Sequence, residues 1–334
     1  MIHGWVLVAG YGSIGRRHFR NLQALGCSDV RLLRGRARAG SFESPDNAKV
    51  YTDLSQALAD KPVAVIVANP TSLHVSVAVA ALQAGAHVVL EKPVAADLQA
   101  AAALVDAART SRGHCSMAYC FRYHPLYRKV HDVVTSGRIG RAFHAHTWQG
   151  SFLPSWHPWE DYHESYAARS DMGGGVIRTL DHDLDVLRWT LGQPESVLAS
   201  GGALSGIGIS AEDTADMIFR FPQRVQACAH LSFARQDYCR GMWVVGEEGS
   251  VNLDWNARSV TVFKGKEPDE TLQLPADFDL NTIYIEMLRD ALAGFAASPP
   301  RAAIELTEGL ASLEMALGAL QSSREGRAVT LKGA

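Results

Sequence analysis

Met1-Ile-His-Gly-Trp-Val-Leu-Val-Ala-Gly-Tyr-Gly-Ser-Ile-Gly15 is the stretch from which the rest of the chain can be interpreted. Its residues 5–9 form an apolar run typical of a buried strand, and the glycines that follow have the spacing G-x-G-x-x-G ahead of a helix-like segment. In such a turn Gly10 allows the tight bend, Gly12 lets the backbone approach a pyrophosphate, and Gly15 lets helix and strand pack closely. The context predicts a dinucleotide site; the alternative is an ordinary glycine turn.

Asp29-Val-Arg-Leu-Leu-Arg34 predicts the second strand. An NAD site carries an acidic residue at the end of this strand, where it binds the ribose 2'-hydroxyl, but Arg34 holds that place here, with Arg36 and Arg38 close behind. A guanidinium there suits a 2'-phosphate, so we expect NADP or NAD, with NADP slightly favoured. The alternative is that these arginines edge a solvated loop.

Length and composition limit the function classes. A chain of 334 residues predicts two domains, at roughly 150 residues per domain. The net charge of -3 gives no electrostatic reason to expect nucleic acid or an anionic membrane as partner. No apolar run approaches the roughly 20 residues of a membrane span, and the N-terminus does not have the pattern of a secretion signal. We therefore expect a cytoplasmic protein.

Strand-like and helix-like segments alternate through residues 1–120, which predicts a doubly wound α/β Rossmann domain over that range. Two of its predicted strands, 63–68 and 87–90, are followed by polar loops, Asn69-Pro-Thr-Ser-Leu-His74 and Glu91-Lys92-Pro93. In an open parallel sheet, ligands bind beyond the carboxyl ends of the strands. Both loops are therefore expected to face the cofactor.

Residues 121–334 have a different pattern and predict a second, α+β domain for substrate binding and oligomerisation. Runs of alternating polar and apolar residues predict a large antiparallel sheet with one open face. These runs cover residues 142–148, 196–202, 214–221, 225–233, 241–246, 250–255 and 260–264. Helices are expected at 126–136, 279–295 and 305–323, and an edge strand at 328–331. The open face predicts a homodimer or homotetramer.

The chain resembles the glucose-fructose oxidoreductase and inositol dehydrogenase family (Gfo/Idh/MocA), over nearly its whole length. The resemblance rests on the glycine turn, the 69–74 loop, Glu-Lys-Pro after a strand, Phe121-Arg-Tyr-His-Pro125, Gly173-Gly-Gly175 and His182-Asp-Leu-Asp185. It implies a Rossmann domain beside an open-faced antiparallel sheet, with Lys92 by the nicotinamide and substrate hydroxyl and His182 as general acid or base. The cofactor contacts expected from the motifs are Gly10, Gly12, Ser13, Ile14, Gly15, Arg34, Asn69, Pro70, His74, Glu91, Lys92 and Arg122.

Physical chemistry agrees with these two roles. Hydride loss from a carbinol carbon requires removal of the hydroxyl proton, and a nearby cation stabilises the developing alkoxide. Lys92 supplies such a cation, and an imidazole such as that of His182 is the side chain whose ordinary pKa lies near neutral pH. The alternatives are a solvated lysine at a strand end and a helix histidine satisfied by Asp185 one turn on.

Arg178 departs from the family pattern. Many members carry an aspartate four residues before the histidine, and our alignment puts Arg178 there, on the helix face expected to hold His182. An arginine stays protonated and cannot act as a base, but it can clamp a substrate carboxylate or phosphate or lower the pKa of His182. The alternative is a salt bridge to Asp181 or another acid. Arg178 and Asp181 are therefore candidate substrate contacts.

The segment 151–166 is dense in aromatic and polar residues and has no regular periodicity. Long ordered loops of this kind often carry function. The resemblance puts it at the substrate pocket, with Trp156, His157, Tyr162 and Arg169 as candidate contacts to a sugar. The alternative is an aromatic cluster that only holds the loop down. The histidine spacing matches no helical metal motif, so we expect no metal.

The leading function is an NAD(P)-dependent oxidoreductase acting on a hydroxyl or keto carbon of a sugar, inositol or nucleotide-sugar. One alternative is an NAD-dependent glycoside hydrolase that oxidises its substrate transiently. Another is a nucleotide-binding regulatory protein that has lost its chemistry, an alternative motivated by the Arg178 departure.

Overall fold

The computed structural model describes residues 3–35, 43, 45 and 48–333. Within them the chain divides into two compact units: the first holds residues 1–120 and 280–310, and the second holds 121–279 and 311–334. The second range was expected to run unbroken from 121 to 334. Residues 280–310 belong to the first unit instead because helix α8 (Asn281–Phe295) buries Ile283, Met287 and Leu288 and packs on elements of that unit.

The first unit has a six-stranded parallel sheet in the order β3-β2-β1-β4-β5-β6. Its strands are β1 (Val6–Ala9), β2 (Val30–Leu33), β3 (Val50–Tyr51), β4 (Ala64–Val67), β5 (His87–Leu90) and β6 (Cys115–Met117). The central strands β1 and β4 are buried at every residue, as a parallel sheet between helices requires. The predicted Rossmann domain is confirmed.

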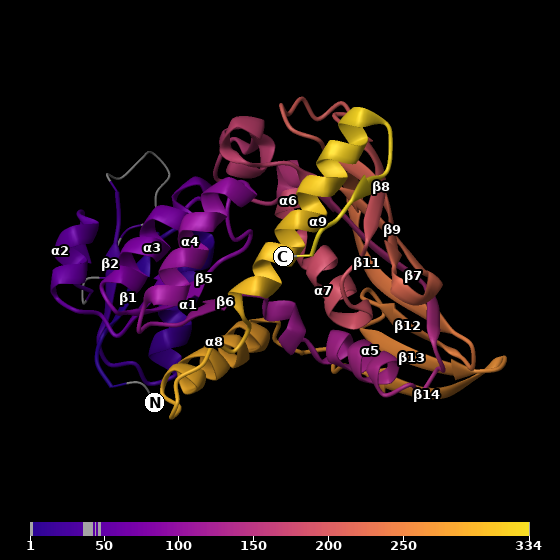
Figure 1. The fold of residues 1–334 in the computed structure, drawn as a ribbon, viewed down its shortest axis with the longest axis horizontal. Coiled ribbons are helices and arrows are strands. Elements are labelled where there is room, and N and C mark those ends of the chain that lie inside the picture. The colour runs from indigo at the N-terminus through magenta and orange to yellow at the C-terminus, as the bar shows by residue number, and fades with distance from the viewer. Residues whose placement is uncertain (1–2, 36–42, 44, 46–47, 334) are drawn as a thin grey trace. The chain divides into compact units, whose positions relative to one another are not determined.

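Helices of the first unit connect these strands (Figure 1). They are α1 (Ser13–Ala24), α2 (Leu54–Ala59), α3 (His74–Gln83) and α4 (Leu98–Thr110), with α8 packed against α1. Asp53 and Asp97 cap α2 and α4 by accepting the backbone N–H groups of Gln56 and Ala100.

The second unit has a nine-stranded sheet in the order β14-β13-β12-β11-β7-β10-β9-β8-β15. Its strands are β7 (Ala142–Phe152), β8 (Ser196–Gly202), β9 (Thr214–Phe221), β10 (Val225–Ser232), β11 (Ala234–Gly246), β12 (Ser250–Asp254), β13 (Ser259–Lys264), β14 (Glu267–Gln273) and β15 (Val329–Thr330). The sheet is mostly antiparallel, as predicted, but β7 and β10 pair in parallel. Strand β14 escaped prediction because it is rich in acidic residues and lacks an apolar face.

Helices cover one face of this sheet (Figure 1). They are α5 (Pro125–Thr135), α6 (Val176–Thr179), α7 (Asp181–Leu191) and the part of α9 (Leu306–Glu325) that belongs to the second unit. On β10, Ala227, Ala229 and Leu231 are buried toward that face, whereas Gln226 is exposed on the other. In the part of the chain that the structure describes, the second face is therefore not covered by helices (Figure 1).

Candidate functional site

The glycine turn after β1 has the close contacts that require glycine. Gly10 has φ +101°, and a Cβ atom there would lie 2.6 Å from the Ala68 carbonyl oxygen. A Cβ on Gly15 would lie 2.1 Å from the Gly10 carbonyl oxygen. Both positions exclude any other residue, because the opposing atoms are backbone. Helix α1 can therefore start directly against the sheet.

Open space lies at the start of α1. A Cβ on Gly12, the N-cap residue, would meet no atom within 4 Å, and no described side chain caps the helix. The first turn carries no acidic residue. Because the first N–H groups of a helix have no intrahelical partner, Ser13, Ile14 and Gly15 offer donors to an anion here. The turn fits a dinucleotide pyrophosphate.

Arg34 follows β2 at the same edge of the sheet. Its backbone N–H donates to the Tyr51 carbonyl at 2.9 Å, and its guanidinium carbon lies 5.3 Å from the ring centroid of Tyr11, in the glycine turn. Arg36 and Arg38, predicted to reinforce it, lie outside the described residues.

The loops after β4 and β5 adjoin the glycine turn because β1, β4 and β5 are neighbouring parallel strands. Asn69 and Pro70 follow β4, and the side-chain oxygen of Asn69 is buried with no hydrogen-bond partner among the described residues. Because buried polar atoms are normally hydrogen-bonded, this oxygen could accept a hydrogen bond from a ligand.

Buried side chains hold the Glu91-Lys92-Pro93 turn after β5 in place. The Glu91 carboxylate accepts the Lys92 backbone N–H at 3.3 Å and lies 2.7 Å from His18 Nε2. Burial acts to raise the pKa of Glu91, but the hydrogen bond from His18 together with the charges of His18 and Lys92 lowers the pKa overall. Lys92 itself is half-buried.

His74, predicted to bind cofactor, is also buried. Its Nδ1 lies 2.8 Å from the Pro93 carbonyl oxygen and its Nε2 lies 3.0 Å from the Asn69 carbonyl oxygen. Burial holds the pKa of His74 below the ordinary value, so the ring is neutral near pH 7. His18 was missed in the sequence because its partner Glu91 is 73 residues away. Its place on α1, three residues after Gly15, was the available clue.

In the second unit, His182 lies in the first turn of α7, with its ring edge-on to Phe121 at a centroid distance of 4.8 Å. The expectation that Arg178 and His182 share one helix face is wrong. The chain leaves α6 and enters α7 at Leu180, whose φ of -91° and ψ of 30° are not helical. A spacing of four residues therefore does not align the two side chains.

Arg178 donates from Nη2 to the Gly174 carbonyl at 2.8 Å, and its buried Nε has no hydrogen-bond partner among the described residues. Burial lowers the pKa of Arg178, and the nearby Glu212 opposes this. Burial raises the pKa of Glu212, because it disfavours the charged form of the carboxyl group as it does that of the guanidinium. Asp181 is buried in the first turn of α7, with 1% of its surface exposed.

Two buried ion pairs anchor α7. Asp183 accepts from Arg240 Nη2 at 2.8 Å, and Asp185 accepts from Arg122 Nε at 2.9 Å. The alternative for His182 was that Asp185 serves as its hydrogen-bond partner. In the structure, Asp185 is bound by Arg122. Arg122, predicted to bind cofactor, has 10% of its side chain exposed and is held by this pair.

The 151–166 segment has contacts of its own. Trp156 packs edge-on against Phe233 at 5.3 Å, and the Tyr162 hydroxyl donates to the Ile207 carbonyl at 2.8 Å. Arg169 pairs with Asp171 at 2.7 Å. His157 keeps a buried Nδ1 without a hydrogen-bond partner among the described residues.

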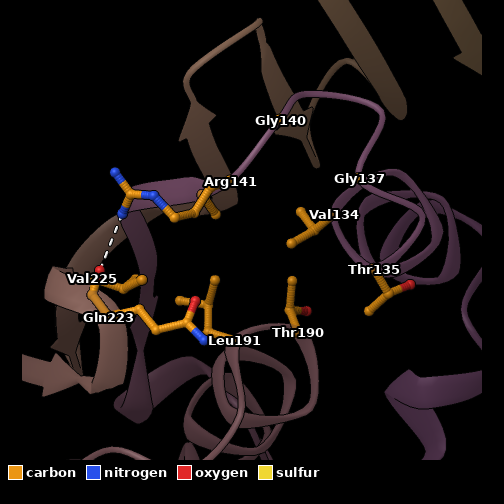
Figure 2. A pocket seen from close by; sticks show the side chains of 10 residues that line it. Val134, Thr135, Gly137, Gly140, Arg141, Thr190, Leu191, Gln223 and Val225 are labelled. Atoms are coloured by element: carbon orange, nitrogen blue, oxygen red, sulfur yellow. Dashed lines mark hydrogen bonds between the residues drawn. The ribbon is translucent and has the colours of Figure 1, made fainter.

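A pocket of about 440 Å³ lies elsewhere in the second unit, at the C-terminal ends of α5 and α7 (Figure 2). Arg141 borders it and donates to the Gln223 carbonyl at 3.0 Å. None of the predicted site residues lines this pocket. In the described part of the chain, no three His, Cys, Asp or Glu residues gather as a metal site would require, and no helix has the length and apolarity to cross a membrane.

Comparison with known families gives two matches. Residues 5–119 match the GFO/IDH/MocA oxidoreductase family, NAD-binding Rossmann fold, and residues 127–252 match the GFO/IDH/MocA C-terminal domain.

Among characterised relatives, the chain is 29% identical to 1,5-anhydro-D-fructose reductase of Ensifer adhaerens over 325 residues, covering 93% of each chain. It is 30% identical to inositol 2-dehydrogenase 2 of Saccharopolyspora erythraea, over 78% of this chain and 76% of the relative.

Solved structures share the fold. GenD2 from gentamicin A biosynthesis, in complex with NAD, has a TM-score of 0.83 at 23% identity and covers 99% of this chain and 97% of its own. Levoglucosan dehydrogenase with NADH and levoglucosan has a TM-score of 0.83 at 18% identity, with coverages of 98% and 99%.

Proposed function

This chain is an oxidoreductase of the GFO/IDH/MocA family that binds a nicotinamide dinucleotide, and from that premise we propose that it oxidises or reduces a hydroxyl or keto carbon of a sugar, inositol or nucleotide-sugar. The substrate class is supported by the two relatives, whose names specify an anhydro-sugar and an inositol. The observation that carries the proposal is the uncapped, open start of α1 at the sheet edge where Lys92 follows β5.

The chain's own groups supply what hydride transfer needs. The bound dinucleotide gives or accepts the hydride. We assign to Lys92 the stabilisation of the negative charge that develops on the substrate oxygen, because an ammonium group lowers the cost of an alkoxide. We assign to His182 the hydroxyl proton, which it accepts in oxidation and returns in reduction.

For the substrate itself we propose His157 and Arg178 among the predicted contacts. Each retains a buried nitrogen without a hydrogen-bond partner among the described residues, and a polar substrate would satisfy it. Trp156 packs on Phe233, and the Tyr162 hydroxyl donates to a backbone carbonyl. We therefore assign to both residues the role of holding the loop in place beside the substrate.

Two finer features complete the proposal. Arg34 favours NADP through the 2'-phosphate, although the solved relatives named above contain NAD or NADH and give this preference no support. The open face of the nine-stranded sheet assembles two or more copies of the chain into a homodimer or homotetramer.

The test follows the absorbance of reduced nicotinamide with a panel of inositols, anhydro-sugars and nucleotide-sugars. For an active substrate, Lys92→Ala and His182→Gln each lower kcat by about 10²–10⁴-fold, because each removes a group that acts in the transition state. Lys49→Ala, which removes an exposed lysine of the same unit, leaves kcat unchanged.

Other outcomes would overturn the proposal. Hydrolysis of a glycoside without net change of cofactor would indicate the glycosidase alternative. Lack of turnover across the panel, with a biological effect that survives Lys92→Ala, would indicate a regulatory protein.

A further inference from the structure

Two buried histidines contact the residues that precede and follow Lys92 in the sequence. His18 contacts the residue before it, Glu91, and His74 contacts the residue after it, Pro93. The side chain of His18 has 0% of its surface exposed and His74 as a whole 2%. The nitrogen of His18 that contacts the turn, and both nitrogens of His74, face protein groups rather than a ligand.

His18 reaches the turn from α1, the helix whose start fits the pyrophosphate. Its Nε2 lies 2.7 Å from one oxygen of Glu91, and the other oxygen accepts the Lys92 backbone N–H at 3.3 Å. Tyr284 of α8 lies edge-on to the ring at a centroid distance of 6.4 Å and helps to enclose it. One helix therefore touches both the predicted phosphate site and the peptide that carries Lys92.

His74 reaches the turn from the start of α3. A neutral imidazole has one N–H, so it donates to only one of the two carbonyl oxygens that it faces. The shorter contact, 2.8 Å from Nδ1 to the Pro93 oxygen, favours the tautomer with its proton on Nδ1. That bond holds the backbone directly after Lys92.

We propose that His18 and His74 are positioning residues for Lys92: each fixes the backbone on one side of it, His18 through the Glu91 carboxylate and His74 through the Pro93 carbonyl. The proposal rests on the proposed role of Lys92 and replaces the direct cofactor contact predicted for His74. It deepens that role, because a small displacement of a group that acts on the reacting oxygen lowers the rate strongly.

The test replaces each histidine with Asn or Gln, because the side-chain amide of each can take the place of one of the two imidazole nitrogens. At position 74, Asn places an N–H near the site of Nδ1 and Gln places one near the site of Nε2. With a substrate identified by the activity panel, His74→Asn therefore retains kcat within about threefold, whereas His74→Gln lowers it by about tenfold or more. At position 18 the order reverses, since Nε2 makes the contact, so His18→Gln retains kcat and His18→Asn loses it.

Two further readouts separate positioning from general damage. The affinity for the dinucleotide, measured by calorimetry, stays within about twofold in all four variants, and the primary isotope effect with deuterated substrate rises in the slow ones as hydride transfer becomes limiting. His87→Gln is the matched control. His87 lies at the other end of β5, where its Nδ1 accepts the His114 backbone N–H, so the substitution lowers the melting temperature without the effect on kcat.

Equal kcat for Asn and Gln at both positions would overturn the proposal. Full activity in Lys92→Ala would instead overturn the proposed function, and with it the reason for positioning Lys92. The two failures are thereby distinguishable.

Discussion

Arg34 is the residue on which the choice of cofactor depends. It lies at the end of β2, and its guanidinium contacts Tyr11 of the glycine turn. A 2'-phosphate there would add a charge-assisted hydrogen bond. We predict by calorimetry that the wild-type protein binds NADP more tightly than NAD. Arg34→Ala should weaken NADP binding by about tenfold, equivalent to about 1.4 kcal/mol, and leave NAD binding unchanged.

Arg112→Ala, which removes an exposed arginine from another part of the same unit, is the control and should alter neither affinity. Tighter binding of NAD than of NADP by the wild-type protein would contradict the role assigned to Arg34.

At the residue scale, the sequence predicted groups whose function depends on local spacing. The glycines and Glu-Lys-Pro could be identified because each motif lies within one turn of chain. The pairs His18 with Glu91 and Arg240 with Asp183 were not predicted, because their members are 73 and 57 residues apart and only the packed fold brings them together.

At the element scale, most strands and helices follow their apolar periodicity. Strand β5 was predicted with its observed bounds, and α7 was not separated from α6 because Leu180 is an ordinary helix former that tertiary packing places in a non-helical conformation. Strand β11 starts at Ala234, well before the predicted 241–246. Its exposed residues 235–238 lie in an irregularity between Ala234 and Cys239, which both pair with β7, so this part has no regular alternation from which a strand could be predicted.

Helix α5 allows a prediction about pH. His124, its N-cap, accepts the Leu126 backbone N–H on Nδ1 at 3.3 Å and stacks on Trp255 at 4.7 Å. Burial, with a smaller effect of Arg240, lowers the pKa of His124 to about 3. The unfolded chain, with a histidine pKa of about 6.5, binds the proton first as the pH falls, so stability is present above about pH 6.5 and is lost below it.

His124→Asn removes the titration and keeps a good N-cap. Between pH 7 and pH 5 the free energy of unfolding of the wild-type protein should therefore fall by about 2 kcal/mol more than that of the variant. Urea unfolding at the two pH values measures this difference. An equal fall in both proteins would show that His124 does not titrate between the folded and unfolded states.

At the scale of the whole molecule, the sequence predicted two kinds of sheet but not the path of the chain between units. The boundary after residue 120 follows from the change in periodicity, whereas the return of residues 280–310 to the first unit depends on which surface α8 covers. An apolar helix face does not specify its partner, so this step needs the structure.

The open face of the nine-stranded sheet carries the prediction about assembly. Leu198 and Ile218 are register partners on β8 and β9, with 44% and 38% of their surfaces exposed, and half-buried Trp148 and Trp243 lie farther along the same face. A second copy placed across a two-fold axis would remove this apolar surface from water. Sedimentation should therefore show a dimer or tetramer.

Ile218→Glu should shift that assembly toward the monomer. In a two-fold interface each copy would bury the new carboxylate, and burial of an unpaired charge is costly. Val105→Glu is the matched control, since Val105 of α4 is exposed to nearly the same extent, 37%, but lies on the first unit. A wild-type protein that sediments as a monomer, or an equal effect of the two substitutions, would contradict assembly through this face.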